Sequence, residues 1–264
     1  MKHITILASV LGILTAVAGA LTTPLTEPLT EEKEITITCE LTEAPKRNDI
    51  VVFDTAKQCE AAKGVYHYKL WLPQGYLADP QKRWPCMFIM SPSGNAAMGN
   101  MAGYLKTNRF VVVMLVESKN GAWEPIVGNF IAAHDDVIKR VRVDQARRFA
   151  TGMSGGARGS SIFVQARPGF AGLILQGAGP AYDDKGAYHS SKLKRDTKLR
   201  VAMTMGATDS NKKEIEKTKA ELSRSRFRVF EFAGGHVWAP PEVFAEAMAW
   251  IMGETDGKPS SLKR

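Results

Sequence analysis

The sequence predicts an α/β protein with a mainly parallel sheet of about eight strands, covered by helices on both faces. Apolar, β-prone runs alternate with amphipathic helical runs along most of the chain. Several strand runs, such as FVVVMLVE at residues 110–117, are continuously apolar, which is expected for strands buried on both faces. The length of 264 residues suits one sizeable core, and no internal repeat divides the chain.

The individual elements follow from these runs. Eight strands are predicted, at residues 35–41, 65–73, 86–91, 110–117, 147–152, 172–177, 199–206 and 227–232. The first of these strands can be antiparallel to the rest. Helices are predicted near residues 127–141, 154–166, 211–224 and 241–253. The last helix begins at Pro240-Pro241 and carries an apolar stripe. In such sheets ligands bind at the carboxyl ends of the strands, so functional side chains are expected in the loops there.

The N-terminus has the pattern of a secretory signal. Lys2 precedes an apolar run from Ile4 to Val17, and Ala18-Gly19-Ala20 follows as a cleavage pattern. We therefore expect a signal peptide at residues 1–20 and a secreted or periplasmic protein. The alternative is an uncleaved anchor helix, but the run is shorter than the ~20 residues that span a bilayer, so no stable membrane insertion is expected after cleavage.

The rest of the chain divides into three parts. Residues 21–34 are rich in Thr, Pro and Glu and are predicted to be a flexible leader, residues 35–255 form the predicted α/β domain, and residues 256–264 form a basic tail. The formal net charge is +8, with basic clusters at residues 192–200 and in the tail. These clusters suit a solvated basic face or an anionic polysaccharide or envelope surface. No nucleic-acid motif surrounds them, so no nucleic-acid partner is expected, and nothing indicates the oligomeric state.

Three cysteines remain after the predicted cleavage. An oxidising compartment allows a bridge between Cys39 and Cys59, with Cys86 buried and free in a predicted strand. A cysteine nucleophile is not expected, because none of the three lies on a sharp loop.

The stretch FATGMSGGARGS at residues 149–160 contains the candidate nucleophile. Gly152-Met153-Ser154-Gly155-Gly156 fits G-x-S-x-G and lies between a predicted strand and a predicted helix, where this motif places a serine on a strained turn. Glycine is needed at positions 152 and 156, because side chains there would collide with neighbouring backbone. The alternative is a structural glycine turn without chemistry.

A serine nucleophile needs a histidine base. His67 lies in a predicted strand, His134 in the middle of a predicted helix, and His189 in a polar loop. His236 follows the last predicted strand and Gly234-Gly235, which places it at the carboxyl edge of the sheet beside Ser154. His236 is therefore the predicted base.

The acid that orients the base is predicted in the loop after the preceding strand. Asp209 follows the strand LRVAMTMG, whereas Asp183 and Asp184, the alternatives, lie in a longer polar loop one strand earlier. The order Ser154, Asp209, His236 is the chain order of the α/β-hydrolase fold. We therefore predict that fold.

Three segments resemble a known group of proteins. RVDQARRFATGMSGGAR, GATDS and GGHVWAPPEVFAEAMAWI are similar to the secreted polyhydroxybutyrate depolymerase, feruloyl esterase and related carboxylesterase branch of the α/β-hydrolases. The resemblance covers roughly residues 65–253. It implies the same nucleophile, acid and base, and it implies a fold and a triad more strongly than a substrate.

The oxyanion loop departs from the pattern common in this superfamily. The usual H-G-x is replaced by MSPSGNAAM, and Pro92 has no N–H to donate. We expect the backbone N–H groups of Ser93 and Gly155 to bind the oxyanion, with the side chain of Asn95 as an alternative. Trp123 and Trp238 are candidate substrate-binding walls of an open site, together with Tyr182 and Tyr188; each is as readily explained by packing.

The predicted activity is hydrolysis of a small-molecule or polymeric carboxylic ester through an acyl-enzyme. No metal or organic cofactor is expected, because the sequence contains no ligand cluster and no phosphate loop. Two alternatives remain open at this stage: a serine peptidase of the same fold that acts on short peptides, and a non-catalytic binding module.

Overall fold

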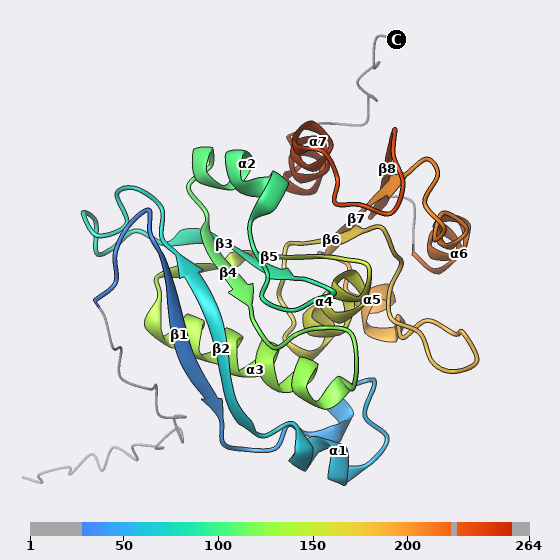
Figure 1. Ribbon diagram of the computed structural model, residues 1–264, viewed down its shortest axis with the longest axis horizontal. Coiled ribbons are helices and arrows are strands. Elements are labelled where there is room, and N and C mark those ends of the chain that lie inside the picture. The colour runs from blue at the N-terminus through green and yellow to red at the C-terminus, as the bar shows by residue number, and fades with distance from the viewer. Residues whose placement is uncertain (1–27, 223–225, 255–264) are drawn as a thin grey trace, which may run out of the picture.

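A computed structural model of the protein describes residues 28–222 and 226–254. Its centre is an eight-stranded sheet with the strand order β1-β2-β4-β3-β5-β6-β7-β8 (Figure 1). The strands are β1 (Glu34–Leu41), β2 (Gly64–Trp71), β3 (Trp84–Met90), β4 (Val111–Leu115), β5 (Val143–Met153), β6 (Gly172–Gln176), β7 (Arg200–Gly206) and β8 (Phe227–Phe232). β1 and β2 are antiparallel to each other, β2 is antiparallel to β4, and all the other pairs are parallel. The predicted mainly parallel sheet is confirmed.

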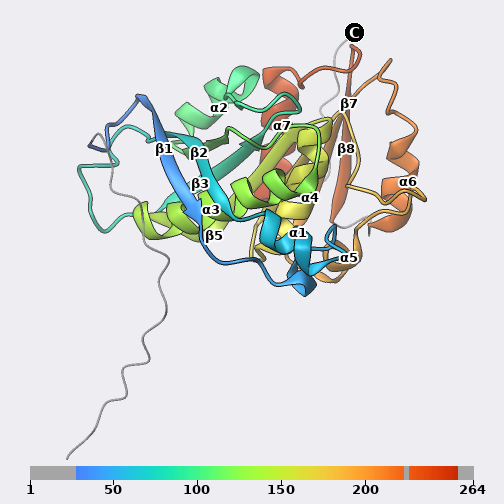
Figure 2. The same ribbon diagram turned by 60° about the horizontal axis from the view of Figure 1, so that its bottom comes forward.

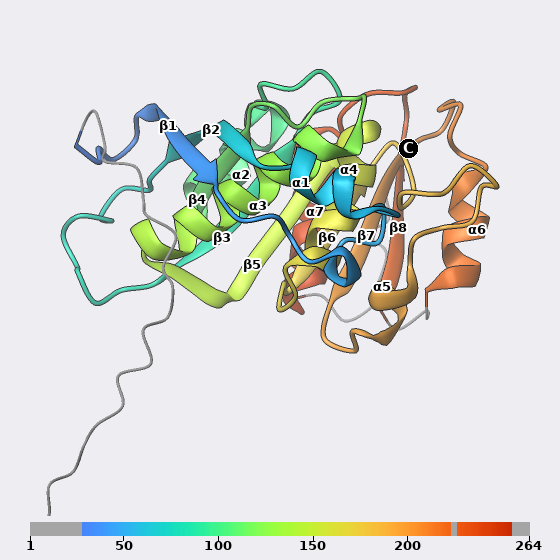
Figure 3. The same cartoon turned by 90° about the horizontal axis from the view of Figure 1, so that it is seen from below.

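Helices cover both faces of this sheet, as predicted (Figures 2 and 3). The helices are α1 (Ala56–Ala61), α2 (Ala102–Thr107), α3 (Trp123–Arg140), α4 (Gly155–Ala166), α5 (Ser191–Arg195), α6 (Glu214–Glu221) and α7 (Pro241–Met252). Buried residues of α3, α4 and α6 share one apolar core with one face of the sheet, and those of α2 and α7 share a second core with the other face. The short helices α1, α2 and α5 were not predicted, because none is long enough to show helical periodicity.

The central strands are buried on both faces. Every residue of β3, β4 and β6 is buried. Along β3, Phe88 belongs to one core, while its neighbours Met87 and Ile89 belong to the other. This alternation explains why these strands read as continuous apolar runs rather than as alternating ones.

The predicted bridge between Cys39 and Cys59 is wrong. Cys39, Cys59 and Cys86 are all free and buried. Cys39 lies on β1, where its thiol donates a hydrogen bond to the carbonyl of Tyr66 at 3.6 Å, whereas Cys59 lies on α1. Sequence spacing could not predict this, because a disulfide requires the two Cα atoms to come within about 7 Å. Burial raises the pKa of the Cys39 and Cys86 thiols, which suits buried packing rather than reactivity.

The predicted terminal segments fall partly inside and partly outside the described residues. The predicted signal peptide and the basic tail lie outside the described residues. The predicted leader overlaps the described part, and there it is attached to the domain: Leu29 packs against the core, and the Glu31 carboxylate accepts the N–H groups of Gly75 and Leu77. None of the described helices combines the length and the apolar character needed to cross a membrane.

Candidate active site

Ser154 occupies a sharp turn between β5 and α4. Its backbone has φ 54° and ψ −117°, a combination that residues with a side chain rarely adopt. The two flanking glycines make this turn fit: a Cβ at Gly152 would lie 2.3 Å from the Gly156 carbonyl oxygen, and one at Gly156 would lie 2.5 Å from the Met90 carbonyl oxygen. The expected collisions at positions 152 and 156 are therefore present.

The histidine and the aspartate predicted from the sequence lie next to this serine. His236 Nε2 is 2.9 Å from Ser154 Oγ, and His236 Nδ1 is 3.0 Å from each carboxylate oxygen of Asp209. The Asp209 side chain is fully buried, whereas that of His236 is 38% exposed. Since an ionised carboxylate only accepts hydrogen bonds, Nδ1 carries the imidazole proton and Nε2 is left to accept from the serine hydroxyl.

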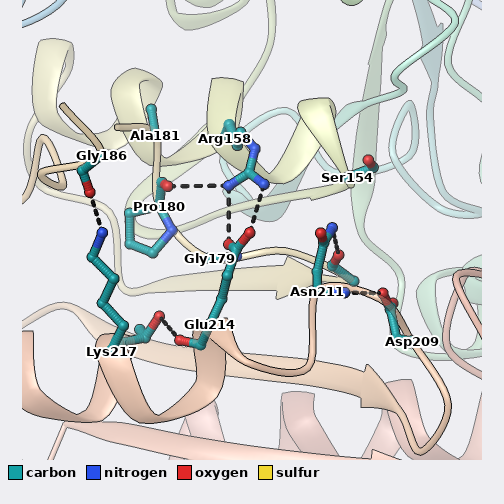
Figure 4. Close-up of polar contacts among 12 residues, drawn as sticks. Ser154, Arg158, Gly179, Pro180, Ala181, Gly186, Asp209, Asn211, Glu214 and Lys217 are labelled. Carbon is teal, nitrogen blue, oxygen red and sulfur yellow. Dashed lines mark hydrogen bonds and ion pairs between the residues drawn. The ribbon is translucent and has the colours of Figure 1, made fainter. Parts of the chain in front are cut away.

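The loop after β7 holds Asp209 by several hydrogen bonds (Figure 4). Asp209 Oδ1 accepts the Asn211 N–H at 2.8 Å, and the Asn211 side chain donates to the Gly177 carbonyl at 2.9 Å, across the next strand end. The alternative acids lie elsewhere: Asp183 accepts the N–H groups of Lys185 and Ala187 in its own turn, and Asp184 is exposed. Of these three aspartates, only Asp209 is bonded to the His236 ring.

The loop that carries His236 lies directly on the acid loop. Both the N–H and the hydroxyl of Thr208 donate to the Gly234 carbonyl, at 2.9 and 3.0 Å. The two loops are so close that a Cβ at Gly206 would lie 2.2 Å from the Gly235 carbonyl oxygen. Neither Thr208 nor Gly206 was predicted as a site residue, although both lie in the short segment that contains Asp209.

The other histidines in residues 28–222 and 226–254 have different partners. His67 Nδ1 on β2 lies 2.7 Å from Glu117, and His134 Nδ1 on α3 lies 2.8 Å from Asp135. The N–H of His189 donates to the Ala181 carbonyl within the loop between β6 and α5.

The two predicted oxyanion donors differ in how free they are. Gly155 is the first residue of α4, so its N–H has no acceptor within the helix and lies at the positive end of the helix dipole. The Ser93 N–H lies 3.3 Å from Ser91 Oγ, which also shares a hydrogen bond with the Ser93 hydroxyl. Asn95 is exposed, and its N–H donates to the Val116 carbonyl. The roles of Ser93 and Asn95 stay predictions.

The predicted walls are mostly packed into the fold. Two of them are half-buried tryptophans: Trp123 at the start of α3 and Trp238 just after His236. They pack against the two different cores. Tyr182 is 45% exposed, and its ring lies 6.5 Å from that of Tyr188. Substrate contact by any of these aromatic residues stays a prediction.

An ion pair that the sequence analysis missed joins the nucleophile helix to α6. Arg158, one turn after Ser154, donates to the Glu214 carboxylate at 2.8 and 3.0 Å, and Glu214 also accepts the Gly179 N–H at 2.7 Å (Figure 4). Although burial opposes ionisation, these hydrogen bonds lower the pKa of Glu214. The Tyr182 ring lies on the Arg158 guanidinium at 4.5 Å. The pair therefore fixes the loop between β6 and α5 against the helix that carries the serine.

No group of three or more His, Cys, Asp or Glu side chains in the described residues is arranged to hold a metal ion. The site brings together the Ser154 hydroxyl, an imidazole, a carboxylate and the N–H groups of a helix N-terminus, a set of groups chemically able to carry out acyl transfer.

Known protein families and curated proteins offer no sequence match to the chain. Solved structures do resemble it. S-formylglutathione hydrolase FrmB from Staphylococcus aureus has a TM-score of 0.59 at 13% identity, with 84% of this chain and 98% of that chain covered. A feruloyl esterase module from Clostridium thermocellum, solved with sinapinate, has a TM-score of 0.57 at 12% identity over 87% and 92% of the two chains. The chain has the α/β-hydrolase fold. At these identities the likeness establishes the fold alone, and at that level the resemblance inferred from the motifs is confirmed.

Proposed function

We propose that the protein is an exported serine hydrolase that cleaves carboxylic esters through an acyl-enzyme intermediate. The observation that carries the proposal is the continuous hydrogen-bonded chain from Ser154 through His236 to Asp209 at the carboxyl edge of the sheet. The similar solved structures include proteins named as feruloyl esterases, an S-formylglutathione hydrolase and a fluorophosphonate-binding serine hydrolase, which supports ester or thioester chemistry.

In the proposed reaction, Ser154 Oγ attacks the ester carbonyl carbon and its proton passes to His236 Nε2. The buried Asp209 carboxylate stabilises the imidazolium and keeps its orientation. The Gly155 N–H stabilises the negative charge on the former carbonyl oxygen. His236 then gives its proton to the leaving alcohol. A water molecule, deprotonated by the same imidazole, releases the acid from Ser154.

The export part of the proposal rests on the sequence pattern of residues 1–20. It is tested by expressing the full chain in a bacterial host and determining the N-terminal residue of the mature protein. Leu21 is expected in the periplasm or medium; an intact Met1 in the cytoplasm would contradict export.

The activity is tested with Ser154→Ala and a matched serine variant. Ser191 is exposed on α5, at the opposite edge of the sheet, so Ser191→Ala serves as the control. With p-nitrophenyl esters of short acids, Ser154→Ala is expected to lower kcat/KM by about 10⁴ or more, and Ser191→Ala by less than about twofold. A purified Ser154→Ala protein that kept more than about a hundredth of the activity would contradict the assignment.

Two further measurements separate the alternatives. A fluorophosphonate probe is expected to label the wild-type protein and not Ser154→Ala; absence of labelling in both would favour a non-catalytic module. Aminoacyl p-nitroanilides are expected to react far more slowly than the matched esters, and the reverse ranking would favour a peptidase.

A further inference from the structure

The loop after β4 (residues 116–122) is fastened to the loop after β3 (residues 91–95), which contains the predicted oxyanion donor. The Asn95 N–H donates to the Val116 carbonyl at 2.7 Å, and the Asn120 N–H donates to the Pro92 carbonyl at 2.8 Å. Between them, Ser93 and Lys119 form an isolated antiparallel bridge. This backbone pairing fixes Asn120 beside the end of the sheet where Ser154 lies.

The side chain of Asn120 rests directly on Gly155. A Cβ built at Gly155 would lie 1.6 Å from Asn120 Oδ1, 2.7 Å from its Cγ and 3.4 Å from its Nδ2. Gly155 does not have a positive φ, so its backbone conformation does not require glycine. The carboxamide of Asn120 therefore fills the space in which a side chain of the residue after the nucleophile would lie.

Asn120 has unused hydrogen-bonding capacity at this position. Its residue is exposed, and within residues 28–222 and 226–254 its carboxamide forms no hydrogen bond with another protein group. By contrast, Pro92 has no N–H, and the Ser93 N–H lies 3.3 Å from Ser91 Oγ. The Asn120 side-chain amide, next to Gly155, is thus a second donor that is available to a ligand, besides the Gly155 N–H.

We propose that Asn120 Nδ2 donates a hydrogen bond to the ester carbonyl oxygen as it becomes the oxyanion, beside the Gly155 N–H. This inference rests on the proposed function and assigns a second donor to it. A neutral amide donor suits this position. Its hydrogen bond to the carbonyl oxygen becomes stronger as negative charge develops there, so it stabilises the transition state more than the bound ester. Gly155 supplies one donor through its backbone and, by lacking a side chain, leaves room for the second.

Steady-state kinetics of Asn120→Ala and Asn120→Asp test the proposal. Asn120→Asp keeps the shape, loses the donor and places a negative charge beside the oxyanion. Each variant is expected to lower kcat by about 10²–10³, with KM changed by less than about threefold. The inhibition constant of a boronic acid, which forms a tetrahedral adduct on the serine, is expected to rise by a similar factor. Asn48 is an exposed asparagine outside the site, so Asn48→Ala is the control and is expected to stay within about threefold of wild type.

A double-mutant comparison separates this role from general damage to the loop. Gly155→Ala is expected to displace the carboxamide and to lose about as much kcat as Asn120→Ala, while Gly155→Ala/Asn120→Ala is expected to be no worse than Asn120→Ala. An Asn120→Ala protein with wild-type kcat, or one with a raised KM and an unchanged kcat, overturns the role of Asn120 alone. A wild-type protein that neither hydrolyses esters nor reacts with fluorophosphonate overturns the proposed function together with it.

Discussion

Two of the histidines in the described part of the chain are each bonded through Nδ1 to an aspartate, and they differ in the group that lies at Nε2. In the site, His236 Nδ1 is 3.0 Å from Asp209 and Nε2 is 2.9 Å from the Ser154 hydroxyl. On α3, His134 Nδ1 is 2.8 Å from Asp135, and Nε2 is 2.6 Å from Arg148 Nη1. A guanidinium can only donate, so His134 Nε2 already accepts a hydrogen bond and faces no group that could give it a proton.

The surroundings reinforce this difference. His134 is 7% exposed and lies among the rings of Phe88, Phe163 and Phe170. Burial lowers its pKa, which keeps the ring neutral. The His236 side chain is 38% exposed, so substrate and water can reach it. The third partner and the exposure of a histidine–aspartate pair therefore decide whether it is suited to a structural role or to proton transfer.

The strongest test of this comparison removes one ring at a time. His236→Ala is expected to lower kcat/KM for p-nitrophenyl esters by about 10⁴ or more, because the serine loses its base. The double variant Ser154→Ala/His236→Ala is expected to be little worse than either single one, since the residues act as a unit. His134→Gln, which keeps an acceptor for Arg148, is expected to stay within about threefold of wild type.

These results are read together with a thermal unfolding measurement. His134→Gln is expected to lower Tm while leaving kcat/KM nearly unchanged. His236→Ala is expected to lower kcat/KM while leaving Tm nearly unchanged. Additive losses in the Ser154/His236 double variant would place His236 outside the catalytic unit.

The second test exchanges the two carboxylates for amides. Asp209→Asn is expected to reduce kcat/KM by about 10³–10⁴ near neutral pH, because the amide favours the wrong histidine tautomer. Asp135→Asn is expected to leave kcat/KM within about threefold, although it removes the ion pair that Asp135 forms with Arg167 at 2.6 Å. Asp183→Asn and Asp184→Asn are expected to lose less than about tenfold; a larger loss at either than at Asp209 would move the acid to the preceding strand end.

The sequence was enough to predict the sheet and the positions of Ser154, Asp209 and His236. In a parallel sheet each strand delivers the residue after it to the same edge, so local patterns and chain order suffice to bring such residues together. The network around Arg158 and the contact between Asn120 and Gly155 could not be predicted in this way. They depend on how two loops pack against a helix, and no local periodicity encodes that packing.

His134 illustrates the same limit on the structural side. Its position in the middle of a helix argued against a catalytic role, but nothing in the sequence indicated that Arg148, on β5, would be its partner. The wrong expectation for Cys39 and Cys59 has a similar cause, because the compartment suggested by the N-terminus says nothing about the distance between the two residues.

The last and smallest effect concerns the pH dependence of stability. The groups that face the His134 ring are Asp135, Arg148 and the three phenylalanine rings around it, with Arg167 bonded to Asp135. Although burial opposes its ionisation, hydrogen bonds from Arg167 and His134 lower the pKa of Asp135, so this carboxylate stays ionised well below pH 6. Neither arginine titrates in this range, which leaves His134 as the titrating group of the cluster.

The sign of the effect follows from the lowered pKa of His134. The unfolded chain binds a proton at His134 below about pH 6.5, whereas the folded protein does so only at lower pH. The contribution to stability is therefore fully present above pH 6.5 and is lost as the pH falls through the folded pKa, by up to about 1.4 kcal/mol per pH unit.

Urea unfolding of wild type and His134→Gln between pH 5 and pH 8 measures this contribution. The difference in unfolding free energy between the two proteins is expected to shrink as the pH falls, because glutamine does not titrate. Curves that stay parallel over this range would show that His134 is not held neutral by its surroundings, and the contrast with His236 would then rest on Nε2 partners alone.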